Sequence, residues 1–231
     1  MHILSAILLQ LDTVAQATDL VEETSAEKLS LIDLLKEGGI LMIPLLLCSV
    51  LMVYVFLERL AVIRKAGDID PTFMARIREH VTDGNLVGAK NLAKNTQGPM
   101  ARIIDKGLSR IGKPVEHIER SMENTGKLQV YNLEKNLSIL STIAGIAPMF
   151  GFLGTIAGMI ILFFNIQHQG FSIENIAGGI YTKMVTSAVG LIIGLLSYVA
   201  YNYLNAQINK AVNKMEAASV EFLDILHEPT K

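Results

Sequence analysis

The chain has 231 residues, of which 51% are hydrophobic and 18% are charged, and its formal net charge is −2 at pH 7. The mean hydropathy of +0.40 excludes an ordinary soluble domain, and the balanced charge argues against a nucleic-acid-binding protein. The apolar residues concentrate in three blocks, 40–57, 137–164 and 176–203, each long enough to cross the roughly 30 Å hydrocarbon core of a bilayer. We therefore predict an all-α integral membrane protein with three transmembrane helices.

Residues 1–39 form the predicted outer, amino-terminal segment. The stretch from Ile3 to Leu11 is apolar enough for the core of a short signal peptide, and Ala15-Gln16-Ala17 fits a cleavage site, but no Lys or Arg precedes it. Cleavage therefore stays open. From Leu29 to Glu37 the apolar residues share one helical face. This pattern predicts an amphipathic helix that lies on the external surface of the membrane that the three spans cross.

The distribution of Lys and Arg predicts the orientation of the spans. The chain is acidic before the first span, 40–57, and basic directly after it, where Arg59, Arg64 and Lys65 follow. The connection 165–175 contains no Lys or Arg. Because positive residues favour the cytoplasmic side, we expect the amino terminus and this connection outside, and 58–136 and 204–231 in the cytoplasm.

The segment 58–136 contains helix-breaking residues at the spacing expected of a small helical domain. Short motifs that contain Pro or Gly and favour helix ends occur at 70–71, 83–84, 98–99 and 112–114. They predict short helices over 71–81, 85–95 and 99–111. No further Pro appears until Pro148, so we predict one continuous helix from Val115 to Phe164, roughly 75 Å long. The third span is likewise expected to continue as a helix into the carboxyl-terminal segment 204–231.

The second and third spans carry small and polar residues at helical spacing. On the second span these are Pro148, Gly151, Gly154, Thr155 and Gly158, and on the third Lys183, Ser187, Gly190, Gly194 and Ser197, with Thr182 and Thr186 beside them. Pro148 predicts a helix bend, and the glycines predict close helix packing. The hydroxyls leave two alternatives, a hydrogen bond to a carbonyl of their own helix or a water-compatible lining of a conduction path.

Catalysis is not predicted. The five histidines are scattered without the spacing of a metal pair, and no nucleotide-binding loop or nucleophile motif is present. We accordingly expect no metal and no cofactor. The single cysteine, Cys48, lies inside the first block and is interpreted as a packing residue.

None of the three apolar blocks contains Asp, Glu or His. The chain therefore has no side chain at membrane depth that takes up and releases a proton near pH 7. If the protein conducts protons, another subunit must supply the carboxylate.

Three motifs together resemble a known family. They are Ala-Pro-x-x-Gly-x-x-Gly-Thr at 147–155, the run Gly-Gly-Ile-Tyr-Thr-Lys-Met-Val-Thr-Ser-Ala-Val-Gly-Leu at 178–191, and Phe-Leu-Glu-Arg at 56–59. With the three-span layout they are similar to the ExbB/TolQ branch of the MotA/TolQ/ExbB proton channel family.

The resemblance implies a pentamer around an apolar pore, in which two helices of an ExbD/TolR-like partner each carry a proton-binding aspartate. It places the family's pore-lining threonines at Thr155 and Ser187. The helical spacing of the third span adds Thr186, Thr182 and Lys183 to the predicted path. It also implies an inner-membrane motor that drives a TonB-like or TolA-like arm. The chain departs from the family at Thr182, where glutamate is common, and at Lys183, where a small residue is usual.

Two other functions stay open, a MotA-like stator subunit and a non-conducting membrane scaffold. The MotA branch is disfavoured because it usually has four spans and a larger cytoplasmic domain. Lys183 has two interpretations as well. Its ammonium group either extends toward the headgroups near Glu174 or faces the pore and pairs with the partner's carboxylate.

Overall fold

The computed structural model describes residues 40–67, 70–169 and 173–227, and these form helices without a strand. The helices are α3 (Met42–Gly67), α4 (Phe73–Thr82), α5 (Leu86–Asn95), α6 (Pro99–Leu108), α7 (Val115–Glu134), α8 (Leu137–Gln169) and α9 (Ile173–His227). The predicted all-α class is thereby confirmed. The expected leader and amphipathic helix within 1–39 lie outside the described residues.

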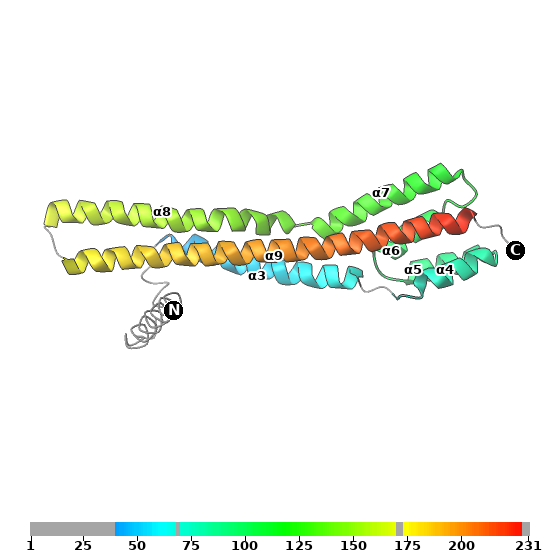
Figure 1. Cartoon of the computed structure of the whole chain (residues 1–231), viewed down its shortest axis with the longest axis horizontal. Helices are drawn as coiled ribbons and strands as arrows, with labels where there is room; N and C mark the ends of the chain where they lie inside the picture. Colours follow the sequence, from blue (N-terminus) through cyan, green and yellow to red (C-terminus); the bar gives the residue numbers. More distant parts are fainter. Residues whose placement is uncertain (1–39, 68–69, 170–172, 228–231) are drawn as a thin grey trace, which may run out of the picture.

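Helix α9 runs along the whole molecule (Figure 1). At 1.5 Å per residue its 55 residues extend for roughly 80 Å. Helices α3 and α8 lie against its amino-terminal part, whereas α4, α6 and α7 contact its carboxyl-terminal part. We call α3, α8 and residues 173–203 of α9 the membrane half, and α4 to α7 with residues 204–227 the polar half.

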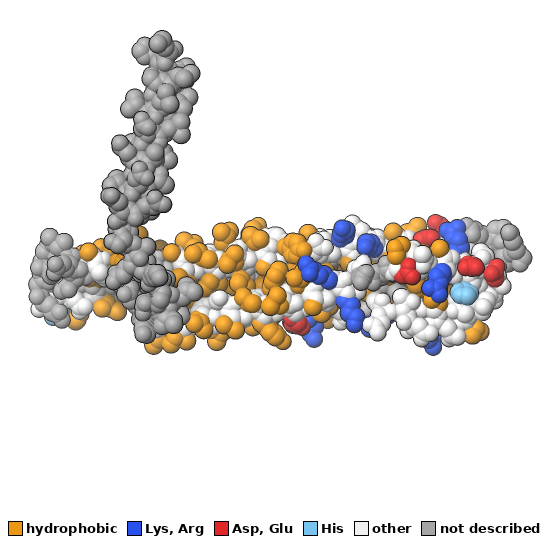
Figure 2. All heavy atoms as spheres, turned by 90° about the horizontal axis from the view of Figure 1, so that it is seen from below, with side chains coloured by type: hydrophobic (Ala, Val, Ile, Leu, Met, Phe, Trp, Pro, Cys, Tyr) orange, Lys and Arg blue, Asp and Glu red, His pale blue; other side chains and the backbone are white. Residues whose placement is uncertain are grey.

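The two halves differ in their surfaces. Among the described residues, three helices are long and apolar enough to cross a membrane. Large apolar side chains such as Ile43, Phe152 and Leu195 are exposed on them. Figure 2 shows this apolar surface giving way to Lys, Arg, Asp and Glu along the molecule. A surface of this kind suits lipid, and the chain is a multi-pass membrane protein.

The predicted continuous helix from Val115 to Phe164 is interrupted, which corrects the expectation. Helix α7 ends at Glu134 and α8 begins at Leu137, with Asn136 at a φ of 63°. Asparagine adopts this left-handed conformation more readily than most residues. Helix α7 consequently leaves the line of α8 and packs on the distal part of α9 (Figure 1).

The polar half has a core of large side chains. Ile77, Ile104, Met122 and Phe222 are almost completely buried there. Helix α4 begins at Phe73, two residues later than predicted, because Thr72 is its amino-terminal cap residue. The Asp70 Oδ1 atom instead accepts hydrogen bonds from the Thr72 backbone N–H at 2.8 Å and from its hydroxyl at 2.7 Å.

Candidate functional site

Helices α8 and α9 meet along a line of small residues in the membrane half. A Cβ atom added to Gly190 would lie 2.7 Å from the Ala147 carbonyl oxygen, and one added to Gly194 would lie 2.6 Å from Pro148 Cγ. A Cβ on Gly151 would lie 3.1 Å from the Ser187 Cα atom. The two backbones therefore approach each other at these positions, and we call this contact line the α8–α9 seam.

The seam continues toward the α8–α9 connection through two polar residues. Thr186 is 1% exposed, and its Cγ2 atom lies 3.0 Å from where a Cβ of Gly154 would be. The methylene groups of Lys183 cover Gly158 so closely that a Cβ there would collide with them. Lys183 is half-buried, so its stem packs on α8 while its ammonium group remains within reach of water or of another chain.

The hydroxyls of the predicted proton pathway lie in different surroundings. Thr155 is half-buried and its Oγ1 atom donates a hydrogen bond to the Phe152 carbonyl of its own helix at 2.6 Å. Ser187 is also half-buried and has its backbone against Gly151. The side chain of Thr182 lies outside the described residues. The structure thus brings Thr186, Ser187 and Lys183 to the seam, and leaves part of Thr155 uncovered by this chain.

One hydrogen bond crosses the seam at its other end. The Ser197 Oγ atom, which is fully buried, donates to the Leu140 carbonyl oxygen on α8 at 2.8 Å. Ser197 shares the helical spacing of Lys183, Ser187 and Gly190. A buried hydroxyl needs a partner in a lipid environment, and here the carbonyl of the neighbouring helix supplies it.

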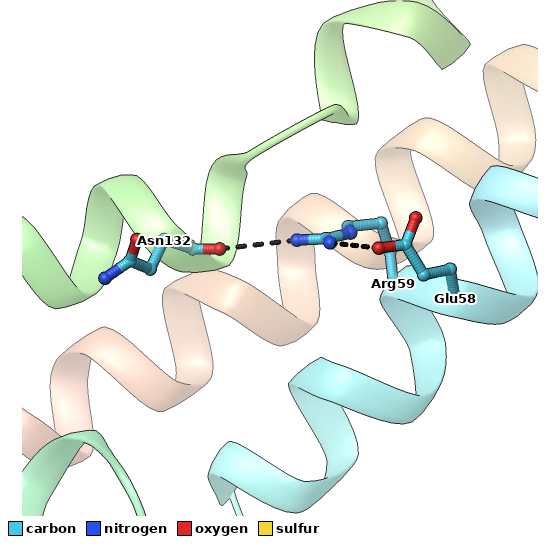
Figure 3. A network of polar contacts seen from close by, with 3 residues as sticks. All are labelled: Glu58, Arg59 and Asn132. Carbon is cyan, nitrogen blue, oxygen red and sulfur yellow. Dashed lines mark hydrogen bonds and ion pairs between the residues drawn. The ribbon is translucent and has the colours of Figure 1, made fainter.

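A buried arginine connects α3 to the end of α7, as Figure 3 shows. Arg59 is 5% exposed, and its guanidinium group donates to the Glu58 carboxylate at 2.5 Å and to the Asn132 carbonyl oxygen at 3.3 Å. Among the described residues its Nε atom has no hydrogen-bond partner. A cation at a helix carboxyl terminus stabilises the exposed carbonyls there, so Arg59 supports α7 next to its break from α8.

Arg59 was not identified as a functional residue from the sequence. The sequence places it in the Phe-Leu-Glu-Arg motif and among the basic residues directly after the first span, and neither signal indicates a role inside the fold. No periodicity indicates that it contacts a residue 73 positions later.

Within the described part of the chain, no group of three His, Cys, Asp or Glu side chains is placed to hold a metal ion. The chemistry available at the seam is therefore that of hydroxyls, backbone carbonyls and one ammonium group.

Comparison with known proteins gives a family match that includes the seam together with α6, α7 and most of α9. Residues 95–217, more than half of the chain, match the model of the MotA/TolQ/ExbB proton channel family. The chain is 23% identical to an ExbB homologue of Methanothermobacter thermautotrophicus over 81% of this chain and 67% of that protein. It is 33% identical to the biopolymer transport protein ExbB of Aquifex aeolicus over 37% of this chain and 58% of that protein. It is also 27% identical to the Tol-Pal system protein TolQ of Haemophilus influenzae over 47% of this chain and 48% of that protein.

Proposed function

Because this chain belongs to the MotA/TolQ/ExbB proton channel family, on its ExbB/TolQ branch, we propose that it is the proton-channel subunit of an inner-membrane energising motor. The proposed complex is a homo-oligomer, a pentamer by family resemblance, around helices of an ExbD/TolR-like partner. Proton flow through it would drive a TonB-like or TolA-like arm. Each elementary charge that crosses about 100 mV releases roughly 2.3 kcal/mol, enough to bias a conformational step.

The observation that carries this proposal is the chemistry of the membrane half. The apolar blocks on α8 and α9, 137–164 and 176–203, carry hydroxyls and one ammonium group, but no Asp, Glu or His occurs in the three apolar blocks. Such groups hold water molecules and orient a proton carrier, but they do not carry the proton themselves. A partner helix that supplies a carboxylate would complete the path.

The proposed lining consists of residues that this chain leaves partly uncovered. Thr155 and Ser187 are both half-buried, so each retains surface for a helix from another chain. The hydrogen bond of Thr155 to Phe152 uses its single proton, which leaves the oxygen lone pairs free to accept from water or from a protonated carboxyl group. Thr186 is buried against Gly154, and we assign it to shaping the seam beside the path.

Lys183 is proposed to set the ionisation of the partner's carboxylate. Its stem is held against Gly158, and its charge is expensive at membrane depth unless it is paired. A nearby ammonium group lowers the pKa of a carboxyl group. Exchange of Lys183 for Met should therefore change the pH dependence of proton flux, whereas exchange for Arg should preserve it.

The proposed orientation places the amino terminus outside and the polar half in the cytoplasm. Arg59, Arg64 and Lys65 follow the first span, and the connection 165–175 lacks Lys and Arg. Positive residues are retained on the cytoplasmic side.

Proton flux into liposomes tests the proposal directly. The full chain is reconstituted alone, with an ExbD/TolR-like partner, and with a partner whose membrane aspartate is replaced by Asn. We expect flux only with the intact partner. Equal flux in all three preparations would contradict a partner-supplied carrier, and absence of flux in all three would favour the scaffold alternative.

Exchange of Thr155 for Val identifies the contribution of the hydroxyl in the same assay. We expect normal assembly and at least about a tenfold loss of flux, equivalent to about 1.4 kcal/mol of barrier. Thr142→Val is the matched control, because Thr142 on the same helix also donates to its own helix, to Ser138 at 2.8 Å, and is not one of the proposed pathway residues. Equal flux in the two variants would remove Thr155 from the path.

A further inference from the structure

Two hollows lie along the junction of α3 and α9 and share Tyr203 as a lining residue, and we call them the two portions of one groove. Its first portion encloses about 440 Å³ and is lined almost entirely by apolar side chains, namely Met52, Val53, Phe56, Leu57, Leu196 and Val199, with Ala200 and Tyr203 at its end. This portion lies within two of the spanning helices. Its lining is that of a surface that contacts hydrocarbon.

The second portion of the groove encloses about 270 Å³ and is cationic. Tyr203 lines both portions, and beyond it come Arg64, Lys210 and Lys214. Among the described residues, no carboxylate lines either portion. The Lys214 ammonium group donates to the Gly67 carbonyl at 3.2 Å, which fixes it at the rim of the groove.

These cations lack a counter-charge within the described part of the chain. Arg64 and Lys210 form no ion pair there, and both are exposed. Three positive side chains around one small hollow repel each other, so an anion placed among them would be stabilised. Figure 2 shows Lys and Arg side chains where the apolar surface ends.

We propose that this groove binds one anionic phospholipid, with an acyl chain in the apolar portion and the phosphate among Arg64, Lys210 and Lys214. The two portions adjoin at Tyr203, which favours a lipid over a soluble phosphate, because a free anion would leave the apolar portion unused. Tyr203 lies at the boundary, where an amphipathic ring is best accommodated. From Leu57 to Arg64 the helix rises roughly 10 Å, which separates the acyl region from the headgroup region.

The two portions make separate contributions to binding. The apolar portion accepts the acyl chain of any phospholipid, whereas the cations select a headgroup with net negative charge. Under the proposed orientation this lipid belongs to the cytoplasmic leaflet. Binding in detergent does not depend on that orientation or on proton conduction, so it is tested separately from the proposed function.

Native mass spectrometry of the full chain in detergent tests the headgroup selection. The protein is titrated with phosphatidylglycerol or with phosphatidylethanolamine of identical acyl chains. We expect phosphatidylglycerol to be preferred, and the double variant Arg64→Gln, Lys210→Gln to lose roughly fivefold in affinity per removed cation. The matched control, Lys94→Gln with Lys106→Gln, removes two exposed cations outside the groove and should keep the preference.

Exchange of Ala200 for Phe tests the acyl portion. Ala200 is half-buried and lines the apolar portion, so a larger side chain there should reduce binding of both lipids. The proposal is overturned if the unaltered chain binds both lipids equally, or if the double variant keeps its preference. It is also overturned if the variants change the number of subunits and not the number of bound lipids, because a second copy of the chain would then occupy the groove.

Discussion

Helices pack through small residues at the α8–α9 seam and through large side chains in the core of the polar half. At the seam, Gly151, Gly190 and Gly194 bring backbone against backbone. In the polar half, Phe222, Met122 and Ile104 fill the space between helices with large side chains. Both regions bury α9, and the difference follows from the surroundings of each.

In water, burial of a large apolar side chain is favourable because it removes apolar area from the solvent. In lipid this gain is absent, since the hydrocarbon tails are as apolar as leucine, and helices associate through close contact and polar bonds. The seam has both, with glycines for contact and Ser197 for a bond across it. The chain therefore changes its packing chemistry along α9 at the point where it leaves the membrane half.

The largest effect is expected from removal of a core aromatic ring in the polar half. Phe222→Ala leaves a cavity among α6, α7 and α9 and should lower the free energy of unfolding by about 3 to 5 kcal/mol. Denaturant titration of the full chain in micelles measures this loss. Val220→Ala is the control, because Val220 is 60% exposed on the same helix and should have little effect.

A methyl group added at the seam should lower the free energy of unfolding by a smaller amount, about 1 to 3 kcal/mol. In Gly190→Ala the new Cβ meets the Ala147 carbonyl oxygen and the Gly151 backbone, so the two helices must separate. Gly107→Ala in the polar half meets only the side-chain ends of Phe222 and Met122, at 2.6 and 2.7 Å, which relax more easily. Gly145→Ala, with no neighbour within 4 Å, should not lower the free energy of unfolding in the same titration, because Ala favours a helix more than Gly does.

If Gly107→Ala proved more damaging than Gly190→Ala, the distinction between backbone contact at the seam and side-chain packing in the polar half would fail. Equal losses for Gly190→Ala and Gly145→Ala would show that contact across the seam is not the cause, because Ala favours a helix more than Gly does and propensity alone produces no loss.

The hydrogen bond from Ser197 to Leu140 across the seam should contribute still less to the free energy of unfolding. Ser197→Ala removes the bond to Leu140 and should cost about 0.6 kcal/mol, the usual value for such bonds in membranes. Ser219→Ala is the comparison, because the Ser219 hydroxyl donates to Met215 of its own helix at 2.9 Å and its loss should be near zero. Thermal unfolding of the two variants in one detergent measures the difference, and equal shifts would contradict a specific role for the bond.

The three spanning helices could be predicted from the sequence because their signal is local. Apolar length defines a span, and the spacing of Gly151, Gly154 and Gly158 defines one face of a helix. The break at Asn136 escaped prediction because no Pro or Gly marks it. The contact between Arg59 and Asn132 escaped because tertiary packing alone brings α3 to α7, and the pattern left both hydrogen-bonding alternatives of Thr155 open.

The smallest effect is expected where the polar half meets water, at the start of α4. Hydrogen bonds from the Thr72 backbone N–H and from its hydroxyl hold the pKa of the Asp70 carboxyl below its ordinary value. A carboxyl whose folded pKa is lowered stabilises the fold above its unfolded pKa, about 3.9, and this contribution is lost as the pH falls through the folded pKa. Because Asp70 is fully exposed, solvent screens the effect and confines it to the first turn of α4. Hydrogen exchange of that turn, expressed as protection relative to intrinsic rates, should therefore decrease slightly between pH 5 and pH 3 in the unaltered chain. Asp70→Asn keeps an acceptor without a titrating charge, and an equal decrease in this variant would place the pH dependence elsewhere.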